Sequence, residues 1–217
     1  MRSGSRNRLA PIDPGRAAAH KPGMQSHTGK IRSVCVYCGS SDGADPRFMA
    51  AARELGQALA RAGVGLVYGG GNGGLMGETA RAVVAAGGHV TGVIPRFFQL
   101  KEKLFEGAQE IILVDDMHER KRIMFERSDA FVALPGGIGT LEELAEQLTW
   151  VQLERHTKPV LIADIAGFWK PLLSLFAHMN NEGFLRPGYE LRYLVAEKVA
   201  DVLPMLERAA GRAGATS

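Results

Sequence analysis

Cysteine is scarce in this chain, whose 217 residues include only Cys35 and Cys38. This scarcity gives no support to a disulfide framework, and two thiols alone do not complete a zinc site. A redox Cys-x-x-Cys pair has its first thiol at the start of a helix, whereas this pair ends a predicted strand. We therefore expect both cysteines to be small residues of the core.

Long apolar runs are also missing. No stretch approaches the roughly 20 apolar residues that a membrane-spanning helix needs, and the leader has no apolar segment typical of a signal peptide. The composition, with 46% hydrophobic residues, is that of an ordinary globular protein, and the length suits one domain. We expect a cytoplasmic protein with no membrane partner; a transit peptide is the weaker alternative for the arginine-rich leader.

Acidic residues are rare in residues 1–30, which hold six Lys or Arg against one Asp, a net charge of +5. Because the whole chain carries +3, residues 31–217 carry −2. A slightly acidic body gives no electrostatic footprint for nucleic acid, so we expect no such partner. The leader lacks apolar periodicity and is predicted to be disordered. The expected domain spans 31–208, followed by a flexible tail over 209–217.

From residue 31, short β-branched runs alternate with longer segments of helical apolar spacing. This alternation predicts an α/β fold: a Rossmann-like, doubly wound parallel sheet in three α/β/α layers, with right-handed crossovers and a single domain. Predicted strands are 31–37, 64–69, 89–94, 110–114, 129–134 and 158–163. Predicted helices are 46–63, 73–88, 117–128, 140–153 and 168–183. We further expect an irregular piece over 95–109, then a strand or turn and a helix over 191–208, the helix bent or shortened by Pro204.

Three glycine-bearing loops follow predicted strands: CGSSDGADP (38–46), GGGNGGLMG (69–77) and PGGIGT (135–140). Such loops meet at the carboxyl edge of a parallel sheet, where ligands bind. Backbone amides in glycine loops and at helix starts favour anions, so the three together indicate a phosphate-bearing ligand. The first loop is not G-x-G-x-x-G, and no G-x-x-x-x-G-K-[ST] exists, which argues against a dinucleotide and excludes a P-loop.

Two cations interrupt the apolar side of the predicted helix 117–128. Met117 and Met124 fall on one side of it, and Arg120 and Lys121 lie on that same side. Such cations can snorkel at the edge of an apolar stripe. Because this helix leads directly into the strand before PGGIGT, we favour the interpretation that both point toward the bound phosphate.

Capping boxes are expected for two helices, from Asp116 with Glu119 and from Thr140 with Glu143. The second box accounts for Glu143 but not for the glycines before it. A carboxylate beside an anion cradle is repelled unless it faces something positive, such as a sugar carbon in an oxocarbenium-like state. We therefore interpret Glu143 as facing the anomeric carbon of a nucleotide, where it stabilises positive charge and orients or deprotonates a water.

The motif MHERK (117–121) followed by LPGGIGTLEE (134–143) resembles the paired signature of the LOG family, the cytokinin riboside 5′-monophosphate phosphoribohydrolases, long mislabelled as lysine decarboxylases. YCGSS (37–41) and GGGNGGLMG look like the same family, so the resemblance covers about 31–183. It implies hydrolysis of the N-glycosidic bond of a purine nucleoside 5′-monophosphate to free base and ribose 5-phosphate. We expect no cofactor and no metal; a decarboxylase would need a Schiff-base lysine for pyridoxal phosphate.

The resemblance implies that Arg120 and Glu143 are the catalytic pair, with Arg120 neutralising charge on either the phosphate or the departing base. The sequence departs from some relatives after Pro95, where Arg96 and two phenylalanines stand in place of an acidic residue, so the resemblance does not determine which base is selected. The expected substrate-binding residues are Lys121, Gly136, Gly137, Ile138, Gly139, Thr140, Leu141, Glu142, Thr149, Gly71 and Ser40.

Relatives of this kind are usually homodimers and sometimes hexamers, so the resemblance implies a homodimer or a higher homo-oligomer. The apolar segment FWKPLLSLF (168–176) is either its interface or part of the core. Two other functions stay open. One is a broader nucleosidase acting on AMP and similar 5′-monophosphates, and the other is a binding protein that carries a nucleotide-like cofactor without cleaving it.

Overall fold

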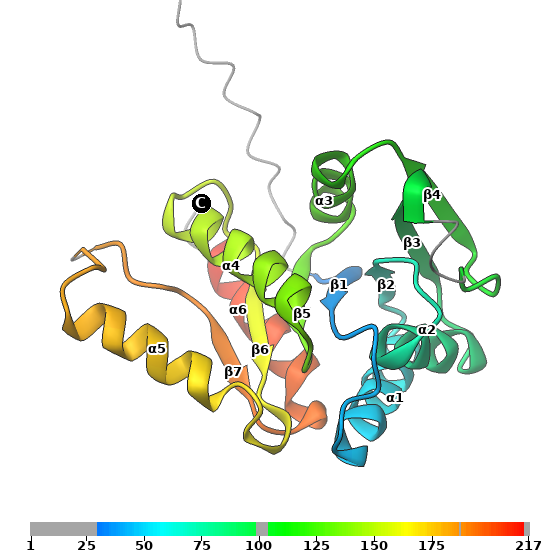
Figure 1. Cartoon of the computed structure of the whole chain (residues 1–217), viewed down its shortest axis with the longest axis horizontal. Coiled ribbons are helices and arrows are strands. Elements are labelled where there is room, and N and C mark those ends of the chain that lie inside the picture. Colours follow the sequence, from blue (N-terminus) through cyan, green and yellow to red (C-terminus); the bar gives the residue numbers. More distant parts are fainter. Residues whose placement is uncertain (1–29, 99–103, 187, 215–217) are drawn as a thin grey trace, which may run out of the picture.

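The protein is built around a seven-stranded parallel sheet with strand order β4-β3-β2-β1-β5-β6-β7 (Figure 1). The computed structural model describes residues 30–98, 104–186 and 188–214; most of the predicted tail at 1–30 lies outside them. All six predicted strands are confirmed, and the segment predicted as a strand or turn contains β7. The strands are β1 Ser33–Tyr37, β2 Gly65–Tyr68, β3 Val90–Pro95, β4 Glu110–Val114, β5 Ala130–Ala133, β6 Val160–Ala163 and β7 Leu194–Ala196.

Helices cover both faces of the sheet, which confirms the three-layer α/β/α class. Alternate side chains of β1 enter opposite cores: Val34 and Val36 pack with α1, α2 and α6, whereas Cys35 and Tyr37 pack with α3, α4 and α5. Within the described residues, no helix is both long and apolar enough to cross a membrane. The helices are α1 Pro46–Arg61, α2 Gly74–Ala85, α3 Met117–Glu126, α4 Ile138–Gln152, α5 Lys170–Asn181 and α6 Val202–Gly214. Short 3-10 turns lie at η1 Arg96–Phe98, η2 Ile165–Gly167 and η3 Val199–Asp201.

The last helix differs from the prediction at its end. Pro204 lies in the first turn of α6, where its missing N–H costs nothing, so the helix starts close before it. It then continues through Gly214, so the tail predicted to start at 209 is partly helical. The reason is burial: Leu206 and Ala210, one turn apart, both pack into the core.

Both cysteines are buried free thiols, as predicted. Cys35 lies on β1, and Cys38 follows directly after that strand. Burial raises the pKa of each thiol, which keeps both protonated and unreactive at neutral pH.

The three glycine-bearing loops meet at the carboxyl edge of the sheet. The chain moves outward from β1 to β4 and then returns to β5 on the other side of β1, the reversal beside which ligands gather in such sheets. The loop after β1 contacts the other two: the amide of Gly39 donates to the Pro135 carbonyl at 3.0 Å, and the amide of Met76 donates to the Gly39 carbonyl at 3.2 Å.

Candidate active site

Helix α3 presents two cations toward α4. The carboxylate of Asp116 caps α3 by accepting hydrogen bonds from two first-turn amides at 2.7 and 2.8 Å. Glu119 reaches back to the amide of Asp115 at 3.0 Å, so the reciprocal half of the predicted capping box is displaced by one residue. The cap fixes where the helix starts and hence its rotation, which turns Arg120 and Lys121 toward α4.

Arg120 is held from three directions and points inward rather than snorkelling. Its Nε donates to the carbonyl of Val93 on β3 at 3.2 Å, and its Nη1 lies 3.4 Å from Oε1 of Glu143 on α4. The same Nη1 is 3.9 Å from the sulfur of Met117. Only 12% of the Arg120 side chain is exposed, so its charge acts in a poorly solvated setting where electrostatic interactions are strong.

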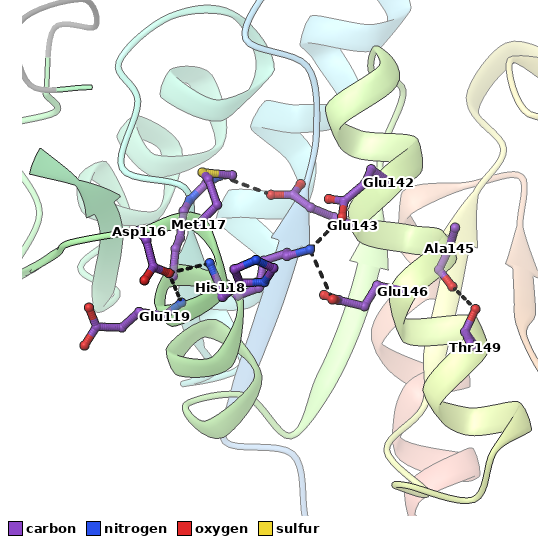
Figure 2. A network of polar contacts seen from close by, with 11 residues as sticks. Asp116, Met117, His118, Glu119, Glu142, Glu143, Ala145, Glu146 and Thr149 are labelled. Atoms are coloured by element: carbon purple, nitrogen blue, oxygen red, sulfur yellow. Dashed lines mark hydrogen bonds and ion pairs between the residues drawn. The ribbon is translucent and has the colours of Figure 1, made fainter. Parts of the chain in front are cut away.

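Lys121 bridges α3 to α4 through two carboxylates. Its Nζ lies 2.6 Å from Glu142 and 3.1 Å from Glu146, and both acidic residues turn from α4 toward α3 (Figure 2). Burial lowers the pKa of Lys121, but the hydrogen bonds to the two carboxylates outweigh burial and raise it. Lys121 therefore ties the two helices together, with its charge already balanced by protein.

Helix α4 begins earlier than the sequence predicts. Its N-cap is Gly137 in an extended conformation, and within the described chain no side chain bonds to the cap position. The predicted capping box of Thr140 and Glu143 is therefore wrong, because Thr140 lies in the first turn and Glu143 in the second. Thr140 instead packs on Gly136, where an added Cβ would overlap its hydroxyl. The first-turn amides are thus left uncapped, and Glu143 has no capping role.

Glu143 is a buried carboxyl group, 9% exposed, with a perturbed pKa. Burial raises its pKa from 4.5 to about 7, and the positive charge of Arg120 opposes this rise without cancelling it. Glu142 and Glu146 also raise the pKa, whereas Lys121 lowers it. A carboxyl group that titrates near neutral pH is suited to take up or release a proton during a reaction.

The loop that precedes α4 leaves open space at the start of the helix. A Cβ added to Gly137 or Gly139 would meet nothing within 4 Å. Ile138 between them is 82% exposed, Glu142 is exposed and Leu141 is half-buried. The predicted substrate-binding residues of this loop therefore lie together at one helix start, on the same helix as Glu143.

Other predicted contacts are more scattered. Ser40 is exposed in the loop after β1, whereas Gly71 is buried and pairs with Leu104 in an isolated bridge. Thr149 is exposed, and its hydroxyl donates to the Ala145 carbonyl at 2.8 Å, further along α4 (Figure 2). Although Thr149 is on the same helix as Glu143, the structure places it away from the ion pair of Arg120 and Glu143.

Two partners of the cations were missed from the sequence. A backbone carbonyl such as that of Val93 carries no sequence signal. Glu146 does have one, because it lies one turn from Glu142 on the same side of α4. In the described ranges, no group of three or more His, Cys, Asp or Glu side chains is arranged to hold a metal ion.

The sheet order and the layers of helices define a Rossmann-like α/β protein. A family described as "Possible lysine decarboxylase" matches residues 76–206. The chain is 46% identical over 178 residues to the probable cytokinin riboside 5′-monophosphate phosphoribohydrolase LOGL5 of Oryza sativa subsp. japonica, covering 82% of this chain and 72% of the relative. It is 43% identical over 184 residues to LOG5 of Arabidopsis thaliana, covering 85% and 81%. Within the Rossmann-like class, the chain therefore belongs to the LOG family of cytokinin riboside 5′-monophosphate phosphoribohydrolases.

Solved structures show the same fold in more distant proteins. The molybdenum cofactor carrier protein of Chlamydomonas reinhardtii superposes with a TM-score of 0.62 at 23% identity, covering 83% of this chain and 98% of that one. The molybdenum cofactor binding protein of Rippkaea orientalis gives 0.63 at 23% identity, covering 82% and 97%. At this identity the likeness concerns the fold alone.

Proposed function

We propose that this protein hydrolyses the N-glycosidic bond of purine nucleoside 5′-monophosphates, with cytokinin riboside 5′-monophosphates, the compounds in its relatives' names, as the substrate class. One observation carries the proposal: Glu143 is a buried carboxyl group with a pKa of about 7 that is paired with Arg120 of α3. Glu143 itself lies on α4, the helix whose first turn is uncapped. Family membership and this arrangement agree on the reaction class.

The substrate's phosphate is assigned to the start of α4. Uncapped first-turn amides and the positive end of the helix dipole favour an anion there, and the open space at Gly137 and Gly139 lets the anion approach the backbone. Arg120 instead arrives from the β3 side, where it is anchored to Val93. We therefore assign Arg120 to negative charge on the departing base.

Glu143 in its ionised form is the proposed base. It takes a proton from water, whose oxygen forms a bond to the anomeric carbon of the ribose. The bond from that carbon to the base nitrogen breaks, and its electron pair leaves with the base, which then takes up a proton. The carboxylate also faces the positive charge that develops on the ribose in the transition state.

Lysine decarboxylation is not the activity of the named relatives, and the residues here do not suit it. That chemistry relies on pyridoxal phosphate held as a Schiff base on a lysine. The lysine beside Glu143 is Lys121, whose raised pKa and two carboxylate partners make it a poor nucleophile.

We infer that the protein also self-associates through the outer side of α5. No residue of α5 is buried, and Leu175 and Met179 are 45% and 37% exposed. Beyond the helix, Phe184 and Tyr189 are 82% and 51% exposed. Exposed apolar side chains one turn apart, such as Leu175 and Met179, are typical of protein interfaces, and a second copy of the chain is the proposed partner.

The test is release of ribose 5-phosphate from a panel of nucleoside 5′-monophosphates. We expect turnover of isopentenyladenosine monophosphate to exceed that of AMP; faster cleavage of AMP would favour the broader nucleosidase. Glu143→Gln should lower kcat by about 10²- to 10⁴-fold, the usual contribution of a general base. Glu126→Gln, an exposed change on α3, serves as the control and should retain activity. Full activity of Glu143→Gln would overturn the proposal.

A further inference from the structure

Gly69, directly after β2, lies beneath the guanidinium of Arg120. A Cβ added to Gly69 would overlap Nη2 of Arg120, and would lie 3.4 Å from its Cζ and 3.3 Å from the sulfur of Met76. These nearest atoms belong to side chains and not to backbone. A methyl group at this position would therefore displace the guanidinium and leave the strand in place.

Arg120 has little freedom to adapt, because it is fixed at both sides of Gly69. Its Nε is bonded to Val93 on β3, the strand next to β2, and its Nη1 faces Glu143 on α4, which follows β5. The guanidinium spans these two anchors only by crossing the end of β2. The crossing requires a residue with no side chain at that point.

We propose that Gly69 is a positioning residue of the site: its missing side chain provides the space in which Arg120 contacts Val93 and Glu143 together. Its relevance to catalysis rests on the proposed function, whereas its effect on Arg120 does not. The requirement is one of space and not of backbone conformation, because Gly69 is not among the glycines with positive φ.

The same strand provides a matched control in Gly65. A Cβ added there would lie 3.6 Å from the Arg32 carbonyl and 3.9 Å from the His89 carbonyl, which are ordinary contacts. Gly65 also lacks a positive φ. Gly65→Ala and Gly69→Ala thus add the same methyl group to opposite ends of β2, and only the second meets Arg120.

Displacement of Arg120 is reported by the ionisation of Glu143. The positive charge of Arg120 lowers the pKa of Glu143, so its departure should raise that pKa by about 1 unit, the lower end of the effect of a close opposite charge. The other groups that face Glu143 are Lys121 on α3, Glu142 and Glu146 on α4, and Cys35, Tyr37 and Cys38 at β1.

The first experiment does not depend on activity. The unfolding free energy of each background is measured against pH with Glu143 present and with Glu143→Gln, and the difference gives the pKa of Glu143. We expect a pKa about 1 unit higher with Gly69→Ala than in the wild type, and no change with Gly65→Ala. An unchanged pKa with Gly69→Ala overturns the proposal. If Gly69→Ala does not fold, the double variant with Arg120→Ala must fold; its failure to do so also overturns the proposal.

The second experiment measures kcat/KM against pH. Gly69→Ala should lower kcat/KM at neutral pH by about 10- to 100-fold, the scale expected when a catalytic group is misplaced by about 1 Å, and should move the ascending limb to higher pH. In the Arg120→Lys background, whose shorter cation needs less space, the same change should cost less than about twofold. An equal loss in both backgrounds contradicts the proposal. A wild type without hydrolase activity would refute the proposed function while the unfolding experiment still decides the role of Gly69.

Discussion

The stability of the Glu143→Gln variant, in which an amide replaces the buried carboxyl, should increase relative to that of the wild type as pH rises. Two effects on this group compete: burial disfavours the carboxylate, and Arg120 at 3.4 Å favours it. Burial is the larger, so the folded-state pKa rises from 4.5 to about 7. At about 1.4 kcal/mol per unit, ionising Glu143 in the folded protein costs about 3 kcal/mol.

The sign of the pH dependence follows from the raised pKa. Below pH 4.5 the carboxyl is protonated in both states and the cost is absent; above it the unfolded chain releases its proton first, so wild-type stability falls until pH exceeds about 7. Glu143→Gln lacks this titration. Its stability relative to the wild type should therefore increase by about 3 kcal/mol as pH rises, most of it between pH 4.5 and about pH 7.

Urea unfolding of both proteins at a series of pH values measures this difference. The attraction of Arg120 is already part of the folded-state pKa of Glu143, and the exchange of a protonated carboxyl for an amide adds only an offset that does not change with pH, so only the slope is interpreted. A flat difference would show that Glu143 has an ordinary pKa. A difference that decreases with pH would show that attraction to Arg120 exceeds the cost of burial, and the reasoning would be refuted.

Three further results are expected. Wild-type kcat/KM should rise with pH through about 7 as Glu143 ionises, and a profile already flat from pH 5 would contradict its role as base. Lys121→Met should cost about 1 kcal/mol of stability and raise the pKa of Glu143, shifting that rise to higher pH, whereas Arg122→Met on the exposed side of α3 should not shift it. Leu175→Glu with Met179→Glu should give a monomer by light scattering if α5 forms the interface, and an unchanged mass would exclude that surface.

Much of the fold was readable because a parallel sheet buries both faces, and its strands appear as short apolar runs. The run AFVA became β5 for this reason. The start of α4 was predicted wrongly, since Thr140 is the better capping residue by preference. In the structure the N-cap is Gly137, an extended glycine that lies three residues before Thr140. Thr140 then lies in the first turn and packs on Gly136.

The inward direction of Arg120 followed from helical periodicity, because it shares a side with Met117. Its distant anchors did not, since periodicity says nothing about which carbonyl or strand end a long side chain will reach. Lys121 has the same periodicity, yet it meets two carboxylates of α4. Only the three-dimensional spacing of α3 and α4 separates the surroundings of these adjacent cations.

The adjacent positions of Arg120 and Lys121 fix the alignment of α3 with α4. Arg120 and Lys121 occupy consecutive positions and reach different carboxylates of α4, so a slip of α3 along its axis would break every one of these ion pairs at once. Intermediate alignments have no alternative partners among the ion pairs described, and the assembly of the site is therefore expected to be cooperative, with few half-formed states.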